Sequence, residues 1–216
     1  MILKNIVFES YRIAVRSKSL FRNIDINYLM DKFKIAGYAF RIPPPVINPV
    51  ADETSVGFKG PLLQKGEIII DVNSDINSIG IQCNSMDSLI KELETVFLPN
   101  IKAMNLFYKN IWFYELQLKI KKQNEDKNLF KTLYNFGENE AFDIIKNVGT
   151  NMTMSALTLW DSGHPNMEDF TEMRLFIDPL DIELLVYKII LRNKEESIFL
   201  KKIKSINQNV QSEDIM

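Results

Sequence analysis

Apolar and polar residues alternate along two stretches of the chain that begin 105 residues apart, at residues 4 and 109. Residues 4–15 read Lys-Asn-Ile-Val-Phe-Glu-Ser-Tyr-Arg-Ile-Ala-Val, and residues 109–120 read Lys-Asn-Ile-Trp-Phe-Tyr-Glu-Leu-Gln-Leu-Lys-Ile. A period of two residues predicts a half-buried strand in each stretch. A match at a fixed offset indicates an internal duplication. The alternative is a coincidence between two isoleucine-rich strands.

The pattern in the first half predicts a strand, a helix, four strands and a second helix. A helix over 25–35 ends at Gly37, and a short strand follows at 38–42. Three prolines then open a stiff loop over 43–54. Strands are predicted at 55–61, 67–73 and 78–83. Ser85 caps a helix whose apolar positions continue to residue 97, and we expect Pro99 to end it.

The second half has a similar order with one strand fewer. A long strand is predicted over 106–122, helices over 128–136 and 138–147, strands at 152–160, 172–178 and 182–192, and an amphipathic helix near 194–205. The sequence therefore predicts a first unit over residues 1–100, a second unit over 101–206 and a polar tail over 207–216.

Composition narrows the classes of function. Of the 216 residues, 46% are hydrophobic and 25% are charged, which is typical of a globular protein. No signal peptide and no apolar run of about 18 residues is visible, so we expect neither secretion nor a membrane span. The single cysteine, Cys83, indicates a reducing, intracellular compartment, and one His with one Cys cannot form a zinc site. The formal charge of −2 does not by itself indicate a nucleic-acid partner.

The order of predicted elements resembles that of the TATA-box-binding protein family, in divergent forms such as those of archaea and large DNA viruses. The matching residues are Asn5-Ile6-Val7 and Asn110-Ile111-Trp112 at the two strand starts, with further similarity over 57–61, 67–71 and 79–85. The resemblance implies an α+β fold in which two strand-helix-strands-helix units form one curved antiparallel sheet. In that saddle-shaped sheet the helices cover the convex face and DNA lies against the concave face.

The resemblance also implies which residues contact the minor groove. Because side chains alternate on a strand, Asn5, Val7, Tyr11 and Ile13 are expected on one face of the first strand. Asn110, Trp112, Tyr114, Leu116 and Leu118 are expected on the corresponding face of the second. Asn5 and Asn110 would then lie near the pseudo-twofold axis and donate hydrogen bonds to bases. The alternative is that both asparagines only cap strand ends or bond across the strand pair.

Wedges and phosphate contacts complete the implied DNA surface. Phe58 and Phe176 are the candidates for insertion between base steps. A basic rim for phosphates would consist of Arg41, Lys59, Lys119, Arg174 and Lys188.

The acidic segment over 161–170 resembles a loop that receives a protein partner in this family. Within it, Glu168, Asp169 and Phe170 are the candidate contacts for a further transcription factor or polymerase subunit. His164 is the only histidine and has no neighbouring catalytic motif.

We therefore expect a transcription initiation factor that binds A/T-rich double-stranded DNA and acts in a nucleus, a nucleoid or a viral replication compartment. It would need no cofactor, no metal and no small-molecule substrate. The alternative is an interaction module of the same fold in which Trp112 and Tyr114 anchor a protein partner. An enzyme is not expected, because no glycine-rich phosphate loop, carboxylate pair with a base, or metal-ligand set is present.

Overall fold

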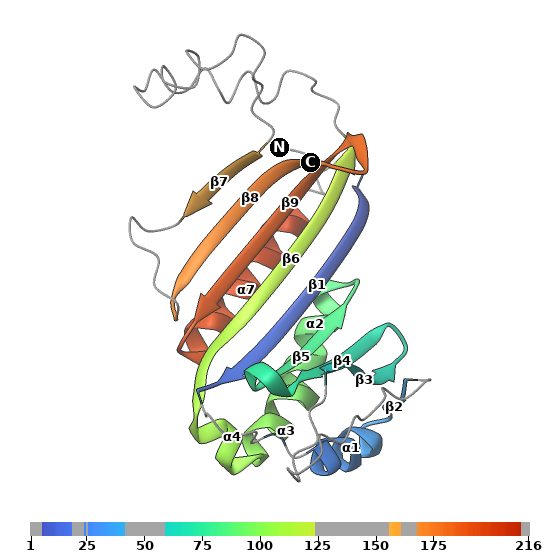
Figure 1. Ribbon diagram of the computed structural model, residues 1–216, viewed down its shortest axis with the longest axis vertical. Coiled ribbons are helices and arrows are strands. Elements are labelled where there is room, and N and C mark those ends of the chain that lie inside the picture. Colours follow the sequence, from blue (N-terminus) through green and yellow to red (C-terminus); the bar gives the residue numbers. More distant parts are fainter. Residues whose placement is uncertain are drawn as a thin grey trace.

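One antiparallel sheet of nine strands dominates the described part of the chain (Figure 1). The structure is a computed structural model that describes residues 6–18, 24, 26–41, 59–123, 156–160 and 168–212. The strand order is β2-β3-β4-β5-β1-β6-β9-β8-β7, and every pair is antiparallel. The fold is therefore α+β with a single large antiparallel sheet, as the sequence predicts.

The strands are β1 (Ile6–Ser17), β2 (Ala39–Phe40), β3 (Lys59–Lys65), β4 (Ile68–Asn73), β5 (Ser78–Cys83), β6 (Ile111–Gln123), β7 (Ala156–Trp160), β8 (Phe170–Asp178) and β9 (Asp181–Asn193). The helices are α1 (Ile26–Ile35), the 3₁₀ turn η1 (Ser74–Ile76), α2 (Met86–Glu92), the π-helical turn η2 (Leu93–Phe97), α3 (Leu98–Ala103), α4 (Asn105–Lys109) and α7 (Glu196–Ser212). No described helix is long and apolar enough to cross a membrane.

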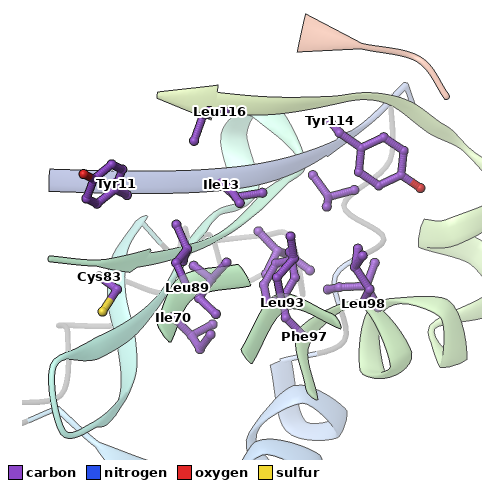
Figure 2. Packing of buried hydrophobic residues seen from close by; sticks show 14 of the residues in the cluster. Tyr11, Ile13, Ile70, Cys83, Leu89, Leu93, Phe97, Leu98, Tyr114 and Leu116 are labelled. Carbon is purple, nitrogen blue, oxygen red and sulfur yellow. The ribbon is translucent and has the colours of Figure 1, made fainter. Parts of the chain in front are cut away.

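All the described α-helices and η2 pack against the same side of the sheet, which we call the helix face. Alternate residues of the two central strands point to this side and are buried, among them Ile13 of β1 and Leu116 of β6. Figure 2 shows these side chains directed toward Leu89, Leu93 and Phe97 of the helical segment. Residues of α7 join the same cluster of buried side chains, and Figure 1 shows this helix behind β6 and β9. One continuous core thus extends beneath both predicted units.

Most predicted elements of the first half are confirmed, with shifts where proline is involved. Helix α1 and strands β4 and β5 lie within a residue or two of their predicted limits. Strand β3 continues to Lys65, four residues beyond its predicted end, and includes Pro61, because a register irregularity between Pro61 and Leu63 accommodates the proline. The prolines of the 43–54 loop and the predicted helices at 128–136 and 138–147 lie outside the described residues.

The prediction that Pro99 ends the second helix is wrong. The helix passes through the π-helical turn η2, in which the Leu98 N–H donates to the Leu93 carbonyl, and it continues as α3 with Pro99 in its first turn. Within a continuous helix a proline lacks the N–H donor and its ring crowds the preceding turn, so the widened π-helical turn before Pro99 is the feature that accommodates it. The Asn100 side chain donates to the Val96 carbonyl at 2.9 Å and so satisfies a backbone group of the widened turn.

Two boundaries in the second half also differ from the prediction. The long strand begins at Ile111 and not at residue 106, because residues 105–109 form the short helix α4. Helix α7 runs on to Ser212, into the segment that we expect to be a polar tail.

Replacing Phe97 by alanine should test the shared core. Its side chain is fully buried, and its ring centroid lies 6.3 Å from that of Phe33. We expect the free energy of unfolding in urea to fall by about 3–5 kcal/mol, because a large cavity is left. Leu106→Ala is the control, since Leu106 is 70% exposed. Equal effects of the two substitutions would contradict the assignment of Phe97 to the core.

Candidate nucleic-acid interface

The side of the sheet away from the helices, which we call the opposite face, is polar and rich in basic residues. The register of the strands places these residues on it: Arg12, Arg16, Lys59, Lys119, Lys121, Arg174, Lys188 and Arg192 are basic, and Asp71, Glu115, Glu172 and Asp178 are acidic. Basic residues outnumber acidic ones by two to one here, although the whole chain has a formal charge of −2. This face therefore has an excess of four basic residues over acidic ones, whereas acidic residues exceed basic ones in the chain as a whole.

Three cations stand directly beside one another in a row across β6, β9 and β8. Lys119 pairs with Lys188, and Lys188 pairs with Arg174. Ser10 of β1 and Thr158 of β7 extend this row at its two ends. Arg174 forms an ion pair with Glu172, whereas no described carboxylate lies within 4.0 Å of the Lys119 or Lys188 ammonium group. Like charges opposite one another on a sheet are destabilising, so this row favours an anionic ligand.

In the other half of the sheet, an ion pair crosses strand β5. The Arg12 guanidinium donates to both carboxylate oxygens of Asp71, at 2.9 and 2.5 Å. The pair lies above Gly80, where an added Cβ atom would be only 2.6 Å from Asp71 Oδ2 and 2.7 Å from Arg12 Nη2. Burial opposes the charge of Arg12, but the bond to Asp71 and nearby carboxylates outweigh it and raise its pKa. This part of the face is consequently neutralised.

A second arginine, Arg192, is held between aromatic rings near the end of β9. The Arg192 guanidinium lies 4.5 Å from the Phe113 ring centroid and 5.0 Å from that of Phe170. It also donates to Glu115 at 2.5 Å, and Gln117 donates to the other oxygen of the same carboxylate. Cation–π contacts and a charge-assisted hydrogen bond fix the orientation of this side chain.

Trp112 and Glu168 meet at the end of the sheet where β1 ends and β6 begins. The indole Nε1–H donates to Glu168 Oε1 at 2.8 Å, and Lys18 Nζ reaches the same oxygen at 2.8 Å. Lys194 Nζ lies 3.5 Å from the other carboxylate oxygen, and the Arg16 guanidinium is 5.3 Å from the Trp112 ring. Hydrogen bonds from Lys18 and Trp112, followed by the charges of the two lysines, lower the pKa of Glu168 to about 2.

The prediction of which strand face is exposed is wrong. Tyr11, Ile13, Tyr114, Leu116 and Leu118 lie on the helix face and are buried there. Asn110 is not in a strand: it follows α4, and its side-chain amide donates to the Leu106 carbonyl at 2.8 Å. It precedes Gln117, at the middle of β6, by seven residues, so it does not lie near the centre of the sheet.

The remaining predicted DNA contacts are placed as follows. Arg174, Lys188 and Lys119 are brought together in the cation row, while Lys59 lies at the far end of the opposite face and Arg41 is exposed just beyond β2. Phe176 is half-buried on the opposite face, two residues from Arg174. Asn5, Phe58 and the side chain of Val7 lie outside the described residues.

The predicted partner contacts are bonded within the chain. Besides the Glu168 contacts, Asp169 accepts a hydrogen bond from Asn193 at 3.0 Å and lies 3.6 Å from Lys202 Nζ. Phe170 is buried at the start of β8. His164 and the rest of the acidic segment before Glu168 lie outside the described residues.

Several residues of the interface are absent from the sequence-based prediction, chiefly Arg12, Arg16 and Arg192. The signal that could have found them is the polar half of each alternating stretch: Arg12 and Arg16 in the first, and Glu115, Gln117 and Lys119 in the second. These polar residues form the opposite face because the apolar residues that alternate with them are buried against the helices.

The described part of the chain offers no metal site, and comparison with known proteins gives no family. The described residues contain no group of His, Cys, Asp and Glu that could hold a metal ion. No protein-family model, curated protein or solved structure matches the chain. Function must therefore be inferred from the arrangement itself.

Replacing Gly80 by alanine should open the Arg12–Asp71 ion pair. We expect the free energy of unfolding to fall by about 1–3 kcal/mol, because the new methyl group displaces a partly buried, charge-assisted hydrogen bond. In an Arg12→Ala/Asp71→Ala background the same substitution should be neutral or stabilising by about 0.5 kcal/mol, since only the unfolded chain loses freedom. An equal cost in both backgrounds would show that the strain lies elsewhere.

The lowered pKa of Glu168 predicts a pH dependence of stability. The ionised side chain stabilises the fold above its ordinary pKa of 4.5, and this stabilisation is lost as the pH falls toward about 2. The difference in stability between the wild type and Glu168→Gln should therefore be constant near neutral pH and shrink steadily below 4.5. Urea unfolding at a series of pH values measures this difference. A difference that stays the same at all pH values would contradict the stabilisation of the fold by ionised Glu168.

Proposed function

We propose that this protein is a transcription initiation factor of TATA-box-binding-like architecture that binds A/T-rich double-stranded DNA. In this proposal the sheet is a duplicated saddle, DNA lies on the opposite face, and a further transcription factor or polymerase subunit is recruited. The cation row of Lys119, Lys188 and Arg174 is the observation that carries the DNA-binding part. Recruitment of the protein partner rests on the resemblance in sequence order alone.

The arrangement of strands supports the duplication. From the central β1–β6 pair outward, the order is β5, β4, β3, β2 on one side and β9, β8, β7 on the other. Arg12 and Gln117 pair with each other and are 105 residues apart, the same offset as the two sequence stretches. A twofold relation between the halves would place its axis at such a pair.

The starts of the two helices that follow β5 and β9 support it as well. Cys83 pairs with Tyr11, and Leu191 pairs with Leu116, which lies 105 residues after Tyr11. Two residues after each of these positions stands a side chain that accepts a backbone hydrogen bond where the chain enters the helix. The Ser85 hydroxyl caps α2 by accepting from the Ser88 N–H, and the Asn193 side-chain oxygen accepts from the Glu195 N–H at 2.8 Å, just before α7.

The opposite face suits phosphate contacts better than apolar contacts with the groove floor. The central Arg12–Gln117 pair is flanked along β6 by the charged side chains of Glu115 and Lys119. Of the apolar side chains on this face, Phe113 and Phe170 are buried and Ile190 is half-buried. Phosphate neutralisation supplies affinity without reading sequence. A preference for A/T-rich DNA would then come from the shape and narrow minor groove of such duplexes.

A second candidate function is an interaction module that does not bind DNA. The four carboxylates of the opposite face, which belong to Asp71, Glu115, Glu172 and Asp178, favour it because they would repel phosphates. In that case the mixed charges would bind a protein of complementary charge pattern.

Fluorescence-anisotropy titrations against matched A/T-rich and G/C-rich duplexes at two salt concentrations test the proposal. We expect the A/T-rich duplex to bind more tightly and the affinity to fall with salt. Lys188→Ala and Lys119→Ala should each reduce the slope of log K against log salt by about 1 and weaken both duplexes alike. Lys201→Ala, which removes an equal charge from an exposed position on α7, should leave the slope unchanged.

Two results would contradict the proposal. Absence of duplex binding at low salt would favour the interaction module. Equal losses for Lys201→Ala and Lys188→Ala would show that only the overall charge matters and not the row.

A further inference from the structure

The carboxylate of Glu168 sits in a receptor made by three separate parts of the chain. Lys18 follows β1, Trp112 lies at the start of β6, and Lys194 follows β9. Lys18 Nζ and Trp112 Nε1 each lie 2.8 Å from one carboxylate oxygen, and Lys194 Nζ lies 3.5 Å from the other. All three groups are hydrogen-bond donors only, so together they are suited to any anion with several oxygens.

Trp112 is held in place from its ring side as well as through its N–H group. The Arg16 guanidinium lies 5.3 Å from the indole ring, and the Lys18 ammonium lies 5.9 Å from it. The Phe113 ring packs against the indole, with centroids 5.1 Å apart. These neighbours fix the position of the indole ring and so the direction of its N–H group toward the anion.

The receptor is continuous with the basic opposite face. Phe113 links the two, because its ring lies 5.8 Å from the Arg16 guanidinium and 4.5 Å from that of Arg192. Along β9 and just beyond it, Lys188, Arg192 and Lys194 follow at intervals of four and two residues. At about 3.3 Å per residue the distance from Lys188 to Lys194 is roughly 20 Å, comparable with several phosphates of one DNA strand.

We infer that Lys18, Trp112 and Lys194 form a phosphate-binding site for the nucleic-acid backbone, and that Glu168 occupies it as an internal substitute when no nucleic acid is bound. The inference rests on the proposed function, because the phosphate belongs to the same bound duplex. Two ammonium groups and an indole N–H bind a phosphodiester by the same hydrogen bonds that they give to the carboxylate.

Occupation by Glu168 has a measurable consequence for affinity. Before a phosphate enters, the carboxylate must leave two cations with which it forms charge-assisted bonds. The apparent affinity for DNA is then the intrinsic affinity multiplied by the fraction of molecules in which Glu168 has left the site. Removing the charge of Glu168 should therefore strengthen binding beyond the effect of a general change in net charge.

Glu168→Gln and Asp169→Asn are a matched pair for this test. Both remove one negative charge, at adjacent positions, and Asp169 lies near Lys202 of α7 and outside the receptor. In duplex titrations we expect Glu168→Gln to bind at least about threefold more tightly and to steepen the salt slope by about 1–2, because Lys18 and Lys194 become available. Asp169→Asn should change the affinity less than about twofold.

The lysines provide the complementary variants. Lys18→Ala and Lys194→Ala should remove the gain when they are introduced into Glu168→Gln, and should have little effect in the wild type, where Glu168 holds these side chains. Equal gains for Glu168→Gln and Asp169→Asn, or a gain that survives loss of both lysines, would overturn the inference. If no variant binds duplex DNA, the proposed function fails, and a titration with inorganic phosphate then decides whether the site itself exists.

A titration with inorganic phosphate examines the site without DNA. With Trp160→Phe, Trp112 is the only tryptophan, so its fluorescence reports on the receptor. We expect a saturable change on adding phosphate to Trp160→Phe/Glu168→Gln, a much weaker one when Glu168 is retained, and none with chloride at equal ionic strength. Phosphate binding without duplex binding would support the site and refute the proposed function. The lack of any saturable change, or a response to an acidic peptide but not to phosphate, would refute the site.

Discussion

The pairing of β1 with β6 is the constraint on which the rest of the molecule depends. Each of these strands has an apolar side and a polar side, and their register aligns the two apolar sides into the floor of one core. Helices from both halves of the chain cover that floor. A slip of one residue would turn every side chain of β6 to the other side, burying Lys119 and exposing Leu118. The same register that closes the core therefore assembles the basic opposite face.

The fold class and most elements could be predicted because they depend on local patterns. Alternation located the strands, and capping or glycine signals located α1 and the start of α2. The failures have physical causes that a local pattern does not contain. Five residues before β6 are helical, although apolar residues continue through them, and Pro99 is tolerated because a π-helical turn precedes it.

The candidate site was predictable only in part. The sequence identifies Lys119, Arg174 and Lys188 only as separate cations on strands, and the register of three strands makes them neighbours. The sequence pattern predicts that the apolar sides of the central strands face the ligand, whereas the helices cover them. It predicts different ligands for Trp112 and Glu168, whose hydrogen bond joins residues 56 positions apart. Such contacts are properties of the folded chain and not of any one segment.

The two halves of the sheet carry different charges at corresponding places. Counting from the central pair, Ala14, Gly80 and Asp71 in one half occupy the positions of Lys119, Lys188 and Arg174 in the other. In the first half Asp71 is paired with Arg12 above Gly80, so this place carries no net charge. In the second half the three residues form the cation row. A ligand lying across the sheet would therefore meet one attractive half and one neutral half, which gives the bound arrangement a direction.

The ion pair above Gly80 also limits how the sequence can change. The space that a side chain would fill at residue 80 is occupied by groups from two other strands, so the three positions form one unit. A side chain at residue 80 opens the ion pair unless Arg12 or Asp71 is replaced first. Substitution on the strands beside β5 before residue 80 therefore avoids the loss of stability, which favours that order in a change from a neutral half to a basic half.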